Sequence, residues 1–251
     1  MTNRRSFITT AATATVAAVT IPGLISSAFA ESSAKSKIKL NSGDTVLFQG
    51  DSITDWGRDK NTHDANNFNT FGNGYVLTAA GTLLNKYADK NLKIYNKGIS
   101  GNKVYQLAER WDADCLDLKP NVLSILIGVN DFWHTLTNGY KGTSQVYVAD
   151  LRKLLDRTKQ VLPNIQLIIG EPFAVKGVKA VDDKWYPAFD EYRAASKQIA
   201  ADYNAVFIPY QTIFDKALSI APGSYWTIDG VHPSVAGANL MAQAWLETVK
   251  G

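Results

Sequence analysis

Three residues of this chain have the types and the spacing that activate a serine hydroxyl. Ser52 stands two positions after Gly50, behind the apolar run 46–48. His232 lies near the other end of the chain, three residues after Asp229 and directly before a proline. Serine is a weak nucleophile until a base accepts its proton, and a carboxylate can hold one imidazole nitrogen while the other faces the serine. The pattern indicates nucleophilic attack on a carbonyl group, although Gly-Asp-Ser by itself also occurs in ordinary turns.

The chain offers three histidines as the base. His63 lies in a polar stretch, and His134 follows soon after Asn130. Only His232 combines an acidic residue at a defined short spacing with a proline behind it that can start a helix. We therefore expect His232 to be the base that accepts the Ser52 proton. His134 is the alternative base, or a polar residue at the rim of the site.

Acyl transfer also needs hydrogen-bond donors for the negative charge that develops on the substrate oxygen. The backbone N–H groups of Ser52 and Gly98 and the side-chain amide of Asn130 are the expected donors. A glycine at position 98 lets the backbone approach the substrate closely. Taken alone, Gly98 also suits a simple turn, and Asn130 also suits a helix cap.

The elements that must position these residues alternate along the chain. Apolar runs predict strands over 45–48, 92–95, 121–127, 166–169 and 205–208, and helical patterns lie between and after them. The helices are expected over 75–87, 103–115, 145–162, 188–203, 211–220 and 234–249. Such alternation predicts a parallel sheet with helices on both faces. Ser52, Gly98 and Asn130 follow the first three strands, whose carboxyl ends lie along one edge of such a sheet.

Composition places the chain among ordinary globular proteins. It has 251 residues, of which 45% are hydrophobic and 20% charged, and we expect one domain over residues 41–251. Without residues 1–30 it carries 24 basic and 23 acidic residues and no basic block, so we expect no nucleic-acid partner. Cys115 is the only cysteine, which rules out an intrachain disulfide and suggests a core thiol. No cluster of histidines and cysteines has the spacing of metal ligands, so we expect neither a metal nor a cofactor.

The first thirty residues have the features of an export signal. Arg4 and Arg5 open a stretch similar to the twin-arginine motif, a mildly apolar segment follows, and residues 28–30 form an A-x-A cleavage pattern. We expect cleavage after Ala30, a polar leader over residues 31–40, and a periplasmic or extracellular location without stable membrane association. The alternative is a retained membrane anchor, which the threonines and Pro22 of the segment disfavour.

Four short segments together resemble the four sequence blocks of the SGNH hydrolases, also called GDSL esterases and lipases. They are residues 50–53, 96–102, 128–131 and 229–232, in the order found in the family. The resemblance implies a flavodoxin-like three-layer α/β/α sandwich with a five-stranded parallel sheet of order 2-1-3-4-5. It also implies that Ser52 is the nucleophile, His232 the base and Asp229 its orienting acid. Ser52, Gly98 and Asn130 would form the oxyanion hole, and no metal or cofactor would be needed.

Two features suggest which ester such an enzyme would hydrolyse: the expected export of the chain and the tryptophans near the site. Trp56, Trp133 and Trp226 lie in or beside the expected loops at the site, as does Trp185, and aromatic faces can stack on sugar rings. We therefore expect O-acetyl groups on carbohydrate, a small-molecule or polysaccharide ester, as the substrate. The alternatives are a lipase, a lysophospholipase or a thioesterase of the same family, and a non-catalytic carbohydrate- or phosphate-binding protein of flavodoxin-like fold.

Overall fold

Five parallel strands form the centre of the molecule. The computed structural model describes residues 20–32 and 37–251. The strands of the central sheet are β2 (Thr45–Gly50), β3 (Lys93–Asn96), β4 (Val122–Leu126), β5 (Gln166–Gly170) and β6 (Val206–Ile208). Their spatial order is β3-β2-β4-β5-β6, and every pairing is parallel. Counted along the chain, this is the order 2-1-3-4-5, so the predicted sheet is confirmed.

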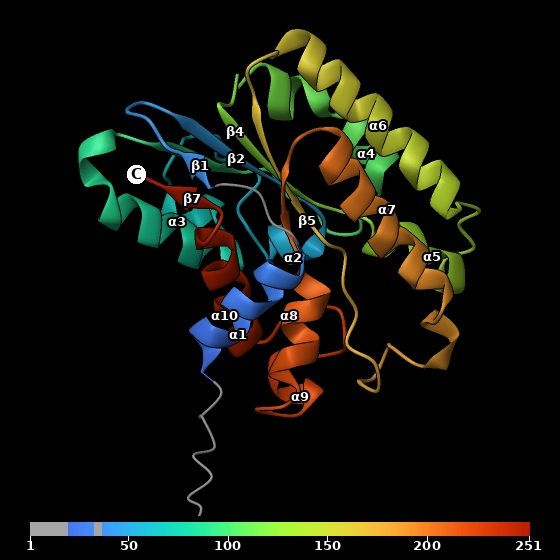
Figure 1. Cartoon of the computed structure of the whole chain (residues 1–251). Coiled ribbons are helices and arrows are strands. Elements are labelled where there is room, and N and C mark those ends of the chain that lie inside the picture. Colours follow the sequence, from blue (N-terminus) through green and yellow to red (C-terminus); the bar gives the residue numbers. More distant parts are fainter. Residues whose placement is uncertain (1–19, 33–36) are drawn as a thin grey trace, which may run out of the picture.

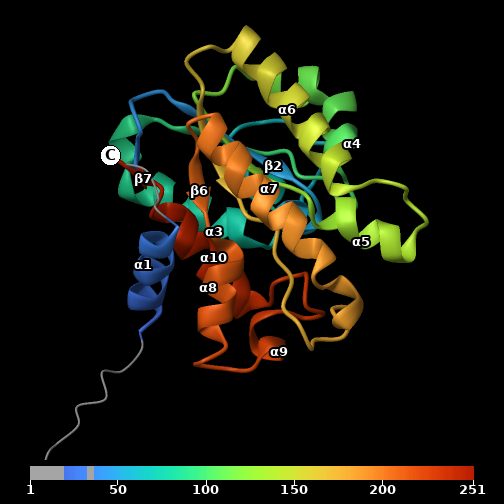
Figure 2. The ribbon, with the colours of Figure 1, turned by 45° about the vertical axis from the view of Figure 1, so that its right-hand side comes forward.

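Both faces of this sheet are covered by helices. The helices are α1 (Ile21–Glu31), α2 (Ser52–Asp55), α3 (Tyr75–Lys86), α4 (Val104–Glu109), α5 (Val129–Thr137), α6 (Ser144–Val161), α7 (Ala188–Asp202), α8 (Tyr210–Ala217), α9 (Gly223–Trp226) and α10 (Val235–Leu246). Helices α3 and α10 lie on one side with α1 and α8, while α4, α6 and α7 lie on the other (Figures 1 and 2). Since both faces are covered, β2 and β4 are buried at every residue and show no polar alternation.

Large aromatic side chains join the layers. The ring of Trp245 on α10 packs 4.7 Å from the ring of Phe48 on β2, and its Nε1–H donates to Ser124 Oγ at 2.9 Å. On the other side of the sheet, Trp111 Nε1–H donates to Thr158 Oγ1 on α6 at 2.9 Å. Each indole therefore buries a large apolar surface and still satisfies its one polar group.

Cys115 is fully buried, as predicted for a core thiol. Burial raises the pKa of this thiol to about 12, so it is protonated at neutral pH.

Several boundaries differ from those predicted. The last helix ends at Leu246 instead of residue 249, because Val249–Lys250 form β7, which pairs with β1 (Ile38–Lys39) in a small parallel sheet. Residues 38–40, assigned to the polar leader, thereby join the folded domain, and Leu40 is fully buried. The helix expected over 103–115 is α4 followed by a π-helical turn at Asp112–Leu116.

The N-terminal segment is described from residue 20 onward. The twin-arginine stretch lies outside the described residues, whereas Ala28 and Ala30 lie within α1. Helix α1 packs on α8 and α10 with Leu24, Ile25 and Ala28 buried, and Lys216 Nζ contacts Glu31 Oε1 at 2.6 Å. No helix among the described residues is long and apolar enough to span a membrane. Cleavage after Ala30 stays a prediction.

Candidate active site

The structure brings Ser52, His232 and Asp229 into one hydrogen-bonded chain. Ser52 is the first residue of α2 and is separated from β2 by Asp51 alone, and His232 and Asp229 lie in the loop between α9 and α10. His232 Nδ1 is 2.7 Å from Asp229 Oδ2, and His232 Nε2 is 2.8 Å from Ser52 Oγ. Since a carboxylate only accepts, Nδ1 carries the proton and Nε2 is left to accept the Ser52 hydroxyl proton. This is the arrangement of a nucleophile with its base and the orienter of that base.

The loop that carries the acid and the base is shaped by Asp229 itself. Its Oδ1 accepts the backbone N–H groups of Val231 at 2.9 Å and of His232 at 2.8 Å. Gly230, between Asp229 and Val231, has φ +97, and a Cβ there would lie 2.5 Å from a methyl group of Val181. One oxygen of Asp229 therefore holds the turn and the other holds the imidazole ring, which explains the three-residue spacing seen in the sequence.

The electrostatics of the pair favour a charged acid beside a basic imidazole. Burial raises the pKa of Asp229, but hydrogen bonds from the His232 ring and from the backbone N–H groups of His232 and Val231 outweigh it, so this pKa lies below its usual value. Burial lowers the pKa of His232, but the hydrogen bond to Asp229 and the charge of that carboxylate outweigh it, so this pKa lies above its usual value. His232 is therefore a stronger base than a free histidine.

The expected role of Gly98 needs correction. Its backbone N–H does not face the opening but donates to Asn96 Oδ1 at 2.9 Å. A Cβ at position 98 would lie 2.5 Å from the backbone nitrogen of Asp55 and 2.8 Å from the carbonyl carbon of Thr54. Gly98 is therefore required because the chain passes very close to α2, and its N–H is not free to stabilise a substrate oxygen.

Gly101 offers the free donor that Gly98 lacks. In the part of the chain that the structure describes, no group accepts a hydrogen bond from the backbone N–H of Gly101 or of Ser52. Gly101 has φ +81 and follows Ser100, which borders the same opening as Ser52. The turn contains two glycines, Gly98 and Gly101. The sequence feature that could have indicated Gly101 is its position directly after Ser100, at the tip of the turn.

Asn130 lies in the first turn of α5 and is 3% exposed. One of its amide N–H groups donates to the carbonyl oxygen of Asn102 at 3.2 Å. An amide nitrogen has two N–H groups, so the second is available to a substrate. The contact with Asn102 also places Asn130 beside the turn that carries Gly101.

The opening at Ser52 is shallow and partly aromatic. It is lined by Ser52, Trp56, Gly57, Asn73, Ser100, Ile228 and His232. The ring of Trp56 lies 5.6 Å from the ring of His232, and the ring of Trp133 lies 6.1 Å from it. Trp56 and Trp133 are only partly buried, so both predicted aromatic residues border the imidazole with some surface free.

Trp226 is placed differently from the prediction. It is 5% exposed, and its Nε1–H points to the carbonyl oxygens of Ala217 and Ala221 at 3.0 and 3.1 Å. Trp185 is also buried, with its Nε1–H bonded to the carbonyl oxygen of Ala180. Both indoles fill the bases of their loops and have little surface left for a sugar, because packing consumes the aromatic faces.

The two other histidines contact lysines instead of serine. His134 Nδ1 is 3.0 Å from Lys103 Nζ, and His63 Nδ1 is 3.4 Å from Lys97 Nζ. Burial and the nearby lysine lower the pKa of His134, so it is neutral at neutral pH. Among residues 20–32 and 37–251, no group of three or more His, Cys, Asp or Glu side chains could hold a metal ion.

Comparison with known proteins gives a consistent result. The sequence profile of the GDSL-like Lipase/Acylhydrolase family matches residues 48–240. An acetylxylan esterase from Geobacillus stearothermophilus is 36% identical over 216 residues, which cover 84% of this chain and 96% of that protein. Its crystal structure has a TM-score of 0.76 at 34% identity and covers 85% of this chain and 97% of that one. A crystal structure from Parabacteroides merdae, assigned as a GDSL-like lipase, has a TM-score of 0.83 at 54% identity, covering 84% of this chain and 98% of that one.

The catalytic residues that were mutated in the Geobacillus enzyme are of the same types as Ser52, Asp229 and His232. Its crystal structures include catalytic mutants of a serine, of an aspartate and of a histidine three positions after that aspartate. The aspartate–histidine spacing is that of Asp229 and His232. With the family profile spanning most of the chain, this protein belongs to the GDSL-like lipase/acylhydrolase family, the SGNH hydrolases, and is a carboxylic ester hydrolase.

Proposed function

We propose that this protein removes O-acetyl groups from carbohydrate through an acyl-enzyme on Ser52. The observation that carries the mechanism is the unbroken chain from Ser52 Oγ through the His232 ring to Asp229. Support for the substrate class comes from the acetylxylan esterase relative and from Trp56, whose partly exposed ring borders the nucleophile.

In the first half of the reaction, Ser52 Oγ attacks the acetyl carbonyl carbon while its proton passes to His232 Nε2. The carbonyl oxygen becomes an oxyanion that accepts hydrogen bonds from the N–H groups of Ser52 and Gly101 and from the Asn130 amide. The tetrahedral intermediate then breaks its bond to the sugar oxygen. That oxygen takes the proton from His232, and the deacetylated sugar leaves.

In the second half, water attacks the acetyl-enzyme. His232 Nε2 takes a proton from the water, and the same donors hold the second oxyanion. When the bond to Ser52 Oγ breaks, His232 returns the proton to that oxygen and acetate leaves. Asp229 stays ionised throughout and stabilises the imidazolium that forms in each half.

A p-nitrophenyl ester series from acetate to palmitate tests the acyl specificity. We expect the acetate to be the best substrate, and acetate release from acetylated xylan to occur in parallel. The Parabacteroides relative is assigned as a GDSL-like lipase, so lipase activity is the competing function. A preference for acyl chains of eight or more carbons, with no acetate release from xylan, would contradict carbohydrate deacetylation.

The pH dependence of kcat/KM follows from the base. Only neutral His232 can accept the Ser52 proton, and Asp229 raises the pKa of His232. Activity should therefore be full at alkaline pH and fall as the pH drops through a midpoint above the ordinary histidine pKa of about 6.5. The pH profile of kcat/KM on p-nitrophenyl acetate measures this fall in activity at acidic pH. A midpoint below about 6.5 would contradict His232, with its pKa raised by Asp229, as the base.

Replacing Asn130 by alanine should lower kcat by about 10²-fold with a smaller change in KM. One oxyanion donor typically contributes this much, because it acts mainly on the charge of the transition state. Steady-state kinetics on p-nitrophenyl acetate checks the prediction. Asn138→Ala, at the exposed end of the same helix, is the control and should behave like the unsubstituted protein.

We also propose that the chain is exported. The support is the pair Arg4 and Arg5, the apolar segment behind it and the A-x-A pattern ending at Ala30. Mass measurement of the protein recovered from the medium or the periplasm would show whether the chain begins after Ala30. Full-length protein found only in the cytoplasm would contradict export.

A further inference from the structure

We propose that Asp55 is a positioning residue that holds the Ser100–Gly101 turn against the nucleophile helix. The proposal rests on the function proposed above, in which Ser52 and Gly101 donate to the same oxyanion. Asp55 lies behind the reacting groups and not among them. Asp55 is the last residue of α2, three positions after Ser52, and is 1% exposed.

The carboxylate of Asp55 binds the turn directly. Its Oδ2 accepts the backbone N–H of Ser100 at 2.9 Å and the hydroxyl of Ser100 at 2.7 Å. Its Oδ1 accepts the backbone N–H of Arg58 at 3.2 Å and an N–H of Lys60 Nζ at 3.0 Å. Hydrogen bonds to an ionised group are shorter and stronger than neutral ones, so this carboxylate fixes Ser100 relative to α2.

The ionised state of Asp55 is maintained despite burial. Burial raises its pKa, but the hydrogen bonds from Lys60 and Ser100 and the charge of Lys60 outweigh this, and the pKa lies below its usual value. All the groups that face this carboxylate are donors. An uncharged side chain of the same shape would therefore leave at least one donor without an acceptor.

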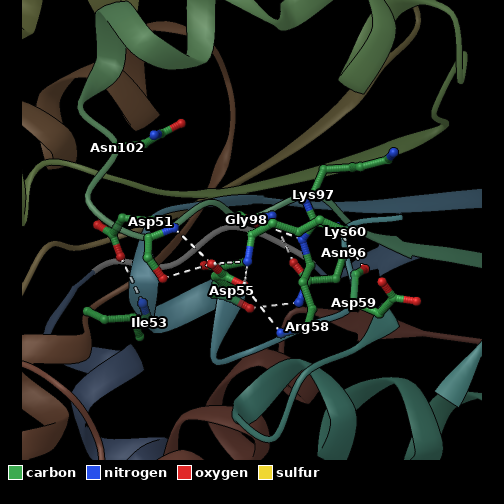
Figure 3. A network of polar contacts seen from close by, with 12 residues as sticks. Asp51, Ile53, Asp55, Arg58, Asp59, Lys60, Asn96, Lys97, Gly98 and Asn102 are labelled. Carbon is green, nitrogen blue, oxygen red and sulfur yellow. Dashed lines mark hydrogen bonds and ion pairs between the residues drawn. The ribbon is translucent and has the colours of Figure 1, made fainter. Parts of the chain in front are cut away.

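Other contacts hold the base of the turn without Asp55. Figure 3 shows Asp55 in the middle of this network, beside Gly98 and Arg58. Arg58 Nε–H donates to the carbonyl oxygen of Gly98 at 2.7 Å, and the Asn96 amide donates to the carbonyl oxygen of Thr54 at 2.7 Å. These bonds end at residue 98, Ile99 N–H donates to the carbonyl oxygen of Gly50, and Asn102 is bound by Asn130 and Arg110. Among the described residues, only Asp55 forms hydrogen bonds with Ser100, which lies next to the free N–H of Gly101.

This division of contacts separates stability from catalysis. Loss of the Asp55 carboxylate should leave the other contacts of the turn in place and release Ser100 from α2. A displacement of about 1 Å between a catalytic donor and the reacting atom can cost about 10²-fold in rate. The consequence should appear in kcat, because the oxyanion forms only in the transition state.

The test compares three variants of the full chain on p-nitrophenyl acetate. Asp55→Asn keeps the shape and should lower kcat by about 10²-fold with KM within about threefold. Ser100→Ala removes the hydroxyl bond and keeps the N–H bond, so a smaller loss of at most about tenfold is expected. Lys60→Met removes the charge that pairs with the same carboxylate. Because the Lys60 side chain is 46% exposed and does not contact Ser100, kcat should stay within about threefold.

Two further measurements separate positioning from damage to the fold. A fluorophosphonate that labels Ser52 counts the competent sites, so kcat can be expressed per labelled site. A boronic acid binds Ser52 as a tetrahedral anion, and its Ki should rise in Asp55→Asn by about the factor by which kcat falls. A structural role alone would lower the number of labelled sites and leave kcat per site and Ki unchanged.

The outcomes distinguish this inference from the function on which it rests. Full kcat per labelled site in Asp55→Asn, beside an inactive Ser52→Ala, would overturn the role of Asp55 and leave the mechanism standing. An equal loss in Lys60→Met and Asp55→Asn would show that charge, and not the contact with Ser100, is responsible. An active Ser52→Ala would instead overturn the proposed mechanism itself.

Discussion

Replacing Ser52 by alanine is expected to lower kcat on p-nitrophenyl acetate by about 10⁶-fold, the size of effect seen when a serine nucleophile is removed. Ser52 Oγ is the atom that must form the bond to the acyl carbon, and it is 2.8 Å from the only imidazole that contacts it among the described residues. Alanine removes one oxygen from a partly buried position and leaves the backbone donor of residue 52 in place. The melting temperature should therefore change little.

The control for this substitution is Ser42→Ala, at an exposed serine whose hydroxyl only contacts the carbonyl oxygen of Lys90. It should have full activity. The residual rate of Ser52→Ala should still exceed that of the uncatalysed reaction, since the oxyanion donors remain. A Ser52→Ala protein with more than about a tenth of the original kcat would show that another residue is the nucleophile.

Replacing Asp229 by asparagine should lower kcat by about 10⁴-fold, the loss typical of a triad whose histidine is held in the wrong tautomer. The amide oxygen can still accept the N–H groups of Val231 and His232, so its NH₂ group would face His232 Nδ1. An NH₂ group forces Nδ1 to accept and moves the imidazole proton to Nε2. A protonated Nε2 cannot take the proton of Ser52.

The same substitution should also change the pH profile. The Asp229 carboxylate raises the pKa of His232, so its loss should shift the acidic limb of the residual activity to lower pH. The kcat/KM profile of the variant measures this shift. Asp183→Asn removes one negative charge from a strongly exposed aspartate and is the control, for which neither kcat nor the limb should move. If the acidic limb of the kcat/KM profile stayed at the same pH in Asp229→Asn, the Asp229 carboxylate would not be what raises the pKa of His232.

Local patterns in the sequence predicted the sheet well. β4 is recognisable because a strand buried on both faces is a continuous apolar run, and β2, β5 and β6 follow the same rule. The pair β1 and β7 was missed for the opposite reason. Two-residue strands carry no periodicity, and their pairing joins residues about 210 positions apart in the sequence, Ile38 with Val249 and Lys39 with Lys250.

The base and its acid were also predictable, because both lie in one short loop and the contact between them is set by their spacing. The oxyanion donors were only partly predictable. Gly98 and Gly101 belong to the same turn, and which of their N–H groups is free depends on the side chain of Asn96 and on how closely α2 approaches. Trp226 was assigned to the site because sequence gives its type but not its burial.

The sequence by itself therefore determined the strands as apolar runs, the position of Ser52 after the first of them, and Asp229 with His232, because each follows from residue types at short spacing. The order of the strands was implied by the family resemblance. Only the tertiary structure decided which glycine N–H is unpaired, which tryptophans keep a free face, and that Asp55 lies against Ser100. The contact between Asp55 and Ser100, for example, joins residues 45 positions apart. Such contacts depend on the three-dimensional packing of donors and acceptors, which no local pattern encodes.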